Sequence, residues 1–215
     1  MTQTKNHSVK IIVALLILGA VGAIVFAKKS ESALDESLVI EEKVKGNPDA
    51  DIVLTKYSDF QCPACRAASP VIDTILEEYG DQVRFEYHHF PLISIHPQAV
   101  RAAQAAEAAG QQGEFFAYHD IVFERQQDWS GQSQGSIDRI FESYAEELGL
   151  DMELYQAHMK SAKIRNHVLD EYAFANNRGY SSTPTFTIND ERIDYGGYNA
   201  LKALIEEEIA KQEQG

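Results

Sequence analysis

The chain has 215 residues, enough for one domain of ordinary size or for one domain that carries an insertion. Hydrophobic residues make up 44% and charged residues 24%, which excludes global disorder, and a formal net charge of −14 disfavours binding to nucleic-acid phosphates. The two cysteines cannot build a disulfide-dense scaffold or a four-thiolate zinc site, so we expect them to act as a pair.

An apolar segment follows a short basic N-terminal segment, residues 1–10. Residues 11–27 read IIVALLILGAVGAIVFA, and at about 1.5 Å per residue this run just reaches across a hydrocarbon core of roughly 30 Å. The two lysines directly after it disfavour cleavage, so we favour an uncleaved transmembrane anchor over a removed signal peptide. Residues 28–45 are mostly polar and are expected to form a linker, which could include one edge strand.

The next part of the chain has the pattern of a strand, a helix and a second strand. Residues 52–57 are apolar and β-branched, as in a central strand, and residues 63–79 have helical spacing that Gly80 ends. Residues 83–87 alternate between apolar and polar side chains. A strand–helix–strand unit of this kind predicts two parallel strands.

A helical block follows, with helices predicted at residues 96–109, 114–125, 136–148, 151–159 and 164–176. Strands are then predicted at residues 185–188 and 192–195, around a hairpin turn at Asn189-Asp190, before a last helix at residues 198–211. This order predicts an α/β fold, in which a mixed sheet with flanking helices is interrupted by an all-helical insertion at about residues 95–178.

The cysteines, Cys62 and Cys65, have C-x-x-C spacing at the predicted start of the first helix. Unsatisfied backbone N–H groups and the positive end of the helix dipole meet at Cys62. They favour a thiolate there and lower a pKa that is ordinarily about 8.5. Cys65, one turn further in, suits the role of a shielded resolving thiol. The spacing therefore predicts disulfide exchange through a mixed-disulfide intermediate.

Two other interpretations of the cysteine pair are less favoured. The pair could be half of a metal site completed by His88 and His89, but histidines at a strand end are more often solvent-facing or hydrogen-bonded. The pair could also be an inert structural disulfide, although a bridge over so short a loop constrains the unfolded chain little. The strand–helix–strand context favours redox chemistry, for which no metal and no dissociable cofactor are expected.

Two further positions are candidates for the same site. Thr183-Pro184 directly precedes the strand at residues 185–188, where proline is tolerated at the first position. The local sequence favours a trans bond, but a cis bond would turn the Thr183 backbone outward to pair with an extended substrate chain. Asp59 is three residues before Cys62, and it is either a buried proton relay or a turn or cap residue. Trp129, in a polar loop, is expected to be a partly exposed packing residue.

Taken together, these motifs resemble the DsbA-like branch of the thioredoxin superfamily, most closely its membrane-tethered forms. The resemblance extends over about residues 46–210. Its matching stretches are GNPDA at 46–50, YSDFQCPAC at 57–65, AAGQQGEF at 108–115 and GYSSTPTF at 179–186.

The resemblance implies a thioredoxin-like fold over residues 46–213 with an inserted helical domain. It places the nucleophile at Cys62, the resolving thiol at Cys65 and a substrate-binding cis-proline loop at Thr183-Pro184. The strongest oxidants of the family have Pro-His between the cysteines, where this chain has Pro63-Ala64. Because an alanine side chain donates no hydrogen bond, we expect a smaller depression of the Cys62 pKa than in the Pro-His enzymes.

The predicted function is a membrane-anchored, extracytoplasmic thiol:disulfide oxidoreductase that forms disulfides in reduced secreted proteins. The location follows from the cysteine pair, because disulfides form and persist outside the cytosol. A membrane quinone-linked partner would reoxidise the pair, as the resemblance suggests. A reductase or isomerase, a non-catalytic binding module and a cytosolic redox sensor are the alternatives.

Overall fold

The computed structural model describes Val13, Ile17 and residues 35–214. The chain divides into two compact units, Met1–Leu38 and Val39–Gly215, and the second contains the sheet and the cysteine pair. Apart from Val13 and Ile17, the predicted anchor lies outside the described residues. Within the described part, no helix is long and apolar enough to cross a membrane.

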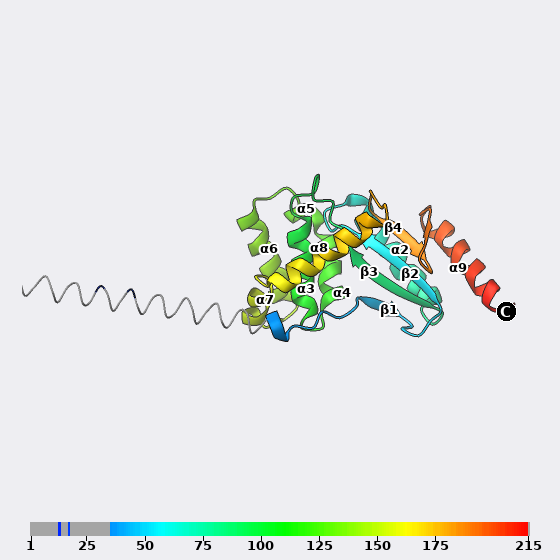
Figure 1. Cartoon of the computed structure of the whole chain (residues 1–215), viewed down its shortest axis with the longest axis horizontal. Helices are drawn as coiled ribbons and strands as arrows, with labels where there is room; N and C mark the ends of the chain where they lie inside the picture. The colour runs from blue at the N-terminus through cyan, green and yellow to red at the C-terminus, as the bar shows by residue number, and fades with distance from the viewer. Residues whose placement is uncertain (1–12, 14–16, 18–34, 215) are drawn as a thin grey trace, which may run out of the picture. The chain divides into compact units, whose positions relative to one another are not determined.

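The second unit is built on a five-stranded mixed sheet with the order β1-β3-β2-β4-β5 (Figure 1). The strands are β1 (Val44–Gly46), β2 (Ile52–Ser58), β3 (Val83–His89), β4 (Thr185–Ile188) and β5 (Glu191–Ile193). β2 and β3 are parallel, as predicted, and the other neighbouring strands are antiparallel. The edge strand β1 includes the last two residues of the predicted linker.

The hairpin between β4 and β5 has the predicted two-residue turn. Asn189 and Asp190 have φ angles of 49° and 67°, so both adopt the left-handed conformation that a type I′ turn requires. Asparagine and aspartate tolerate this conformation better than most residues. β5 therefore begins directly after the turn, one residue earlier than predicted.

The helix α2 (Pro63–Tyr79) connects β2 to β3, and α9 (Tyr198–Gln212) ends the unit. The chain between β3 and β4 forms α3 (Ala99–Gly110), α4 (Phe115–Glu124), α5 (Gln126–Trp129), α6 (Gln134–Glu147), α7 (Met152–His158) and α8 (Ala162–Asn177). The short helix α5 replaces part of a predicted polar loop, because its first and last residues are buried in the helical block.

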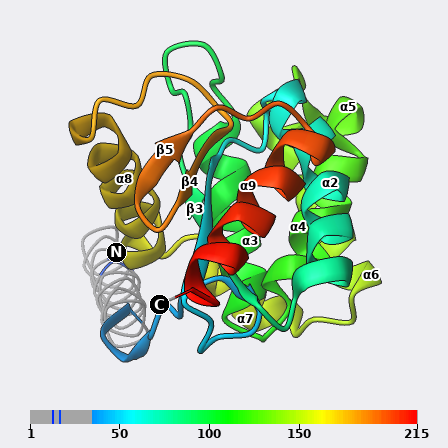
Figure 2. The same ribbon diagram turned by 90° about the vertical axis from the view of Figure 1, so that its right-hand side faces the viewer.

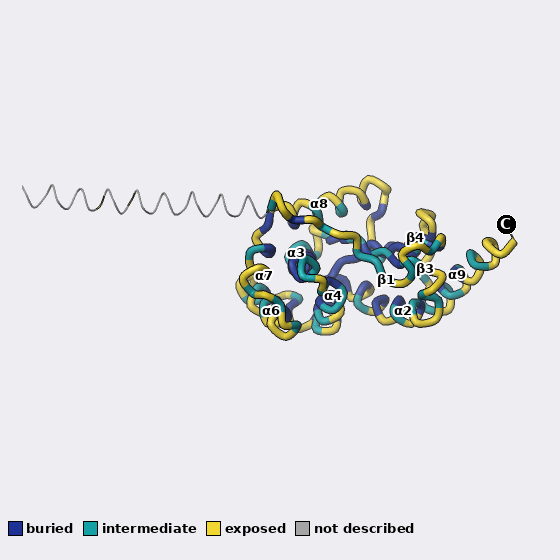
Figure 3. Tube along the Cα trace, turned by 90° about the horizontal axis from the view of Figure 1, so that it is seen from below, coloured by how far each residue is buried: buried dark blue, intermediate teal, exposed yellow. Residues whose placement is uncertain are grey.

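The sheet is covered on both faces. α2 and α9 pack on one face, and α8 packs against β3 on the other (Figures 2 and 3). Successive side chains of β2 therefore point to different helices. Lys56 contacts the α2 side, whereas Tyr57 packs in the cluster with Phe90 and Tyr180 on the α8 side. Burial on both faces explains why β2 is apolar along most of its length.

The prediction of a partly exposed Trp129 is wrong. Its side chain is fully buried, its indole N–H donates to the Val122 carbonyl oxygen at 2.9 Å, and its ring packs on Phe141. The polar residues around Trp129 in the sequence suggested a surface loop. The tryptophan instead supplies apolar volume to the core of the helical block, with its single polar group satisfied.

Candidate active site

The sheet topology brings the cysteine motif and the proline loop together. Cys62 follows the end of β2, and Thr183 and Pro184 precede β4, which is antiparallel to β2. The end of β2 and the beginning of β4 therefore lie at the same edge of the sheet. The Thr183–Pro184 bond is cis, and the Cys62 thiol donates to the Thr183 carbonyl oxygen at a sulfur–oxygen distance of 3.4 Å.

Cys62 is the N-cap residue of α2, with Pro63 in the first turn. Its thiol is not in a disulfide. The pKa of Cys62 is lowered to about 5, foremost because the Cys65 thiol donates a hydrogen bond to its sulfur. Thr183 and the backbone N–H groups of Cys65 and Ala64 add to the effect, and burial opposes it. Ala64 thus supports the thiolate through its backbone, although its side chain cannot.

Cys65 has the opposite character. It is fully buried, and burial raises its pKa well above the usual range. Its sulfur accepts a hydrogen bond from the backbone N–H of Asp59 at 3.5 Å. The two thiols of the motif therefore differ in protonation state at neutral pH: Cys62 is a thiolate and Cys65 is a thiol that donates to it. This is the division between attacking and resolving sulfur that the sequence predicts.

Asp59 is buried, and its carboxylate is occupied by three donors. Its Oδ1 accepts from the backbone N–H of Gln61 at 2.7 Å. Its Oδ2 accepts from the backbone N–H of Leu92 at 2.7 Å and lies 2.7 Å from Nδ1 of His96. Only the Asp59 backbone contacts a cysteine sulfur. Of the two interpretations from the sequence, this placement fits the turn role: the carboxylate ties the loop before α2 to the loop after β3.

Sequence reasoning missed Lys56, which lies under the first turn of α2. It is 1% exposed, and its Nζ donates to the Cys65 carbonyl oxygen at 3.2 Å and to Ser69 Oγ at 2.9 Å. Nζ also lies 5.0 Å from the centre of the Phe123 ring. Burial lowers the pKa of Lys56 to about 8. The sequence shows only a lysine within a predicted strand, which does not distinguish a buried position from a solvent-facing one.

Sequence reasoning also missed Gln126, the first residue of α5. Its buried amide donates to the carbonyl oxygens of Phe60 at 2.7 Å and Cys62 at 3.0 Å. Next to it, Gln61 and Gln98 exchange two hydrogen bonds at 2.8 Å and 2.9 Å. These amides fix the residues around the nucleophile to the helical block. No pattern in the sequence marks them, because glutamine is common on surfaces.

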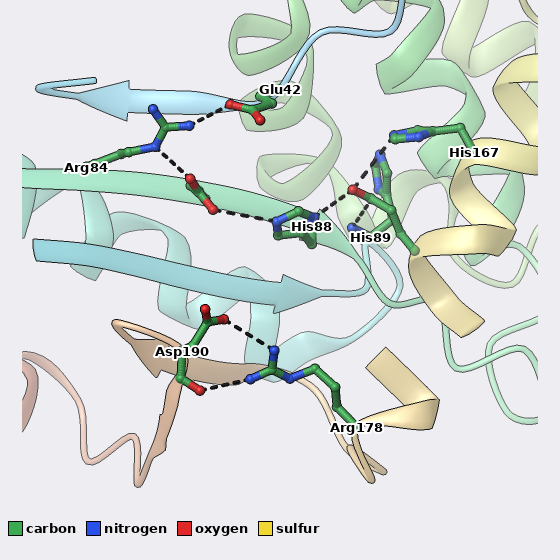
Figure 4. Close-up of polar contacts among 9 residues, drawn as sticks. Glu42, Arg84, His88, His89, His167, Arg178 and Asp190 are labelled. Carbon is green, nitrogen blue, oxygen red and sulfur yellow. Dashed lines mark hydrogen bonds and ion pairs between the residues drawn. The ribbon is translucent and has the colours of Figure 1, made fainter. Parts of the chain in front are cut away.

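The two histidines that might have completed a metal site have other partners (Figure 4). Nδ1 of His88 lies 2.7 Å from Glu171, which also accepts from the backbone N–H of His89 at 2.7 Å. Nε2 of His89 lies 2.9 Å from Glu107. Within the described residues, no group of three His, Cys, Asp or Glu side chains is arranged to hold a metal ion. The histidines instead connect β3 to α8 and α3.

A reactive dithiol at the N-terminus of α2, beside a cis-proline loop and a helical insertion, defines the class of DsbA-like thioredoxin-fold proteins. The thioredoxin family model matches residues 39–207, so the chain belongs to this family. The resemblance predicted from the sequence, to a DsbA-like thioredoxin fold, is confirmed.

Three solved structures are similar to the chain. The thioredoxin-like oxidoreductase from Silicibacter pomeroyi DSS-3 is 26% identical with a TM-score of 0.65, over 79% of this chain and 92% of that one. Oxidised BdbD from Bacillus subtilis is 22% identical with a TM-score of 0.67, over 79% and 93%. α-DsbA1 from Wolbachia pipientis is 23% identical with a TM-score of 0.64, over 83% and 98%. The predicted enzyme class, a thiol:disulfide oxidoreductase, is the class of these neighbours.

The curated relatives carry a different name. A Na(+)/H(+) antiporter NhaA from Salinispora tropica is 33% identical over 181 residues, which are 82% of this chain and 26% of the antiporter. One from Mycobacterium sp. strain KMS is 34% identical over 155 residues, 70% of this chain and 24% of that protein. The chain thus spans about a quarter of the length of these relatives.

Proposed function

We propose that this chain is a thiol:disulfide oxidoreductase that introduces disulfide bonds into reduced secreted or surface proteins on the outer side of the membrane. The observation that carries the proposal is the contrast between the two cysteines of one motif. Cys62 is held as a thiolate at the tip of α2, and the buried Cys65 is held as a thiol.

The reaction starts from the disulfide form. A substrate thiolate attacks the Cys62 sulfur, the bond between Cys62 and Cys65 breaks, and its electron pair goes to the Cys65 sulfur, which takes up a proton. A second substrate thiolate then attacks the substrate sulfur of the mixed disulfide. Cys62 leaves as a stable thiolate because its pKa is low. The substrate gains one disulfide, and the enzyme keeps two electrons as a dithiol.

The low pKa of Cys62 also favours the oxidase direction. Interactions that stabilise the thiolate stabilise the reduced protein relative to the disulfide, and each pKa unit corresponds to about 1.4 kcal/mol. A pair whose reduced form is stabilised gives up its disulfide readily. A membrane quinone-linked partner is proposed to restore the disulfide, as the resemblance suggests. An anchor at residues 11–27 would hold the dithiol beside that partner.

The surface around Cys62 suits an unfolded polypeptide as substrate. The Thr183 backbone is next to the sulfur and belongs to a half-buried residue, so it can pair with an extended chain. In the loop that Asp59 holds in place, Ile93 and Ile95 are 47% and 65% exposed. Exposed apolar side chains in this loop fit reduced, incompletely folded proteins, which themselves expose apolar segments.

Two alternatives remain within this fold: a reductase or isomerase, and a binding module without turnover. They differ from the proposal in the direction of exchange and in the need for Cys62. The antiporter relatives support no transport proposal, because about three quarters of their length lies outside the match.

The test uses the oxidised full chain and a reduced, unfolded client with two cysteines. We expect the client to gain its disulfide while the chain becomes a dithiol, as measured by alkylation and mass spectrometry. Cys62→Ser should abolish exchange. Cys65→Ser, offered the same client in its disulfide form, should accumulate a mixed disulfide at Cys62, because its thiolate opens the client disulfide and no resolving thiol follows. Ser143→Ala, at an exposed position of α6, is the control and should behave as wild type.

Two results would decide against the proposal. Failure of the oxidised wild-type chain to oxidise the client would support a binding module, and reduction of insulin faster than oxidation of the client would support a reductase.

A further inference from the structure

Lys56 occupies an unusual position for a charged side chain. It is in the middle of the central strand β2 and is 1% exposed. Its two hydrogen-bond acceptors, the Cys65 carbonyl oxygen and Ser69 Oγ, are uncharged. Ser69 itself donates to the same carbonyl oxygen at 3.2 Å. A buried ammonium is costly unless an opposite charge compensates it.

The compensating charge does not come from a carboxylate in contact with Nζ, since within residues 35–214 Lys56 forms no ion pair with an Asp or Glu. Among the ionisable groups that face it, Cys65 does the most to keep its pKa up, ahead of Asp73, Cys62 and Asp120. One basic group, His119 of α4, also acts on Lys56. Burial lowers the pKa of His119 to about 4, so it is neutral at pH 7 and adds no positive charge. The ionisable groups that act on the Lys56 charge are therefore the two sulfurs of the motif together with Asp73 and Asp120.

We propose that the Lys56 ammonium is the buried counter-charge of the dithiol, a positioning residue that stabilises the thiolate produced when the disulfide between Cys62 and Cys65 opens. The proposal rests on the proposed function and specifies how this chain regulates the redox equilibrium of that same site.

The charge balance of the exchange reaction explains the effect. The disulfide form carries no charge on sulfur, so the ammonium is uncompensated in that state. When a substrate thiolate attacks Cys62, the electron pair of the broken bond goes to Cys65, above Lys56. At the end of the reaction, the negative charge resides on Cys62. Lys56 therefore favours both the leaving group and the reduced product over the disulfide, which makes the pair more oxidising. No oxidant beyond the enzyme disulfide and no reductant beyond the substrate thiols is needed.

The first test removes the charge. In the full chain, Lys56→Met should shift the equilibrium with glutathione about tenfold toward the protein disulfide, which corresponds to about 30 mV for two electrons. The thiolate absorbance of Cys62 should titrate at a higher pH. Lys56→Gln keeps a hydrogen-bond donor without the charge and should show the same shift. If hydrogen bonding were the only role, Lys56→Gln would match wild type.

The matched control is Lys202→Met. Lys202 is on α9, where it pairs with Glu78 at 2.9 Å, and its removal should leave the glutathione equilibrium unchanged. An unchanged equilibrium in both folded Lys56 variants would overturn the proposal.

The second test needs no variant, so it stands even if the Lys56 substitutions prevent folding. By linkage, a charge that favours the reduced site must itself be favoured by reduction. In protein labelled with ¹³C at the lysine Cε, the Lys56 signal should titrate at a higher pH in the reduced state than in the disulfide state. Equal midpoints in the two states would refute the proposal.

Both tests measure groups of the enzyme itself, the dithiol in the first and Lys56 in the second, and neither uses a client protein. If the Lys56 effects appear but the client is not oxidised, the proposed function fails and the counter-charge stands. If the client is oxidised but the Lys56 effects are absent, the proposed function stands and the counter-charge proposal fails.

Discussion

At the scale of single residues, the Cys62 sulfur takes a different hydrogen-bond role in each protonation state. The neutral thiol donates to the Thr183 carbonyl oxygen. The thiolate can only accept hydrogen bonds. Its donors are the Cys65 thiol, the Thr183 side chain and backbone N–H groups of α2. The Thr183 hydroxyl is buried and has no hydrogen-bond partner among the described residues. No other acceptor competes for its proton, so it can donate to the Cys62 thiolate.

The hydroxyl of Thr183 is therefore expected to tune the redox equilibrium. Thr183→Val keeps the shape of the side chain and removes the donor, so the pKa of Cys62 should rise by about half a unit to one unit. Thiolate absorbance against pH measures the change directly, and the glutathione equilibrium should move toward the disulfide. Thr187→Val, at a buried threonine further along β4, is the matched control. A Cys62 titration that is the same in Thr183→Val and wild type would contradict this role.

The sequence could predict the residues of the site that have local signals. C-x-x-C spacing after a strand marks Cys62 and Cys65, and a threonine–proline pair before a strand marks Thr183. Lys56 and Gln126 have no such signal, because their roles depend on which elements cover them. A lysine in a strand could as well mark a solvent-facing edge, and only the packing of α2 over β2 shows that Lys56 is buried.

At the scale of elements, α8 holds the helical block to the sheet through a buried carboxylate. Glu171 accepts from His88 and His89 of β3, and His167 lies one turn before it on α8, at 3.8 Å (Figure 4). Burial alone would raise the pKa of Glu171, but these histidines lower it to about 2. The pKa of His88 is raised in return, against the effect of burial.

These shifts predict a pH dependence for stability. A carboxyl group with a lowered folded-state pKa contributes its full stability above about pH 4.5 and loses it as the pH falls toward 2. The His88 contribution is full below about pH 6.5 and is lost as the pH rises through its folded-state pKa. Stabilisation by the pair is therefore greatest between these limits.

Glu171→Gln should lower the free energy of unfolding by about 2–3 kcal/mol at pH 5.5, with a smaller difference below pH 4. Urea unfolding over a pH series measures this loss. Asp170→Asn, at the exposed neighbouring position of α8, should change stability little. A Glu171→Gln effect that is constant from pH 3 to pH 6 would show that the charge of Glu171 contributes nothing.

Periodicity predicted the long elements well. β2, α2 and β3 begin within one residue of their predicted positions, since a strand buried on both faces and an amphipathic helix have distinct patterns. The one-turn helix α5 and the burial of Trp129 were missed. Four residues are too few for a helical period. The burial of Trp129 comes from α4 and α6, which contact it through Val122 and Phe141.

At the scale of the whole molecule, the charge is distributed unevenly along the chain. Residues 1–30 contain four lysines and no acid, and the rest contains 15 basic against 33 acidic residues. The basic flanks and the uncharged run between them are the grounds for the predicted anchor. The net negative charge of the remainder favours the solubility of the folded domain in water.

The anchor can be tested by charging its apolar run. In Leu16→Arg/Val21→Arg, each arginine should cost roughly 2.5–3.5 kcal/mol at the centre of a membrane helix, so the double variant should leave the membrane fraction. Thr4→Arg, outside the run, should not. In intact cells, a membrane-impermeant thiol reagent should label Cys62 of the wild-type chain. A wild-type chain found in the soluble fraction, or protected from the reagent, would contradict an extracytoplasmic anchored domain.

The hydrogen bond between the Cys62 thiol and the Thr183 carbonyl oxygen joins positions 121 residues apart. A ribosome therefore releases the C-x-x-C motif long before β4 and the loop in front of it exist. Until that last part of the chain docks beside β2, the exposed sulfur lacks one of its stabilising partners and retains more of the character of a simple thiol. Nascent molecules are thereby less inclined to react with their neighbours, and full reactivity marks the completion of folding.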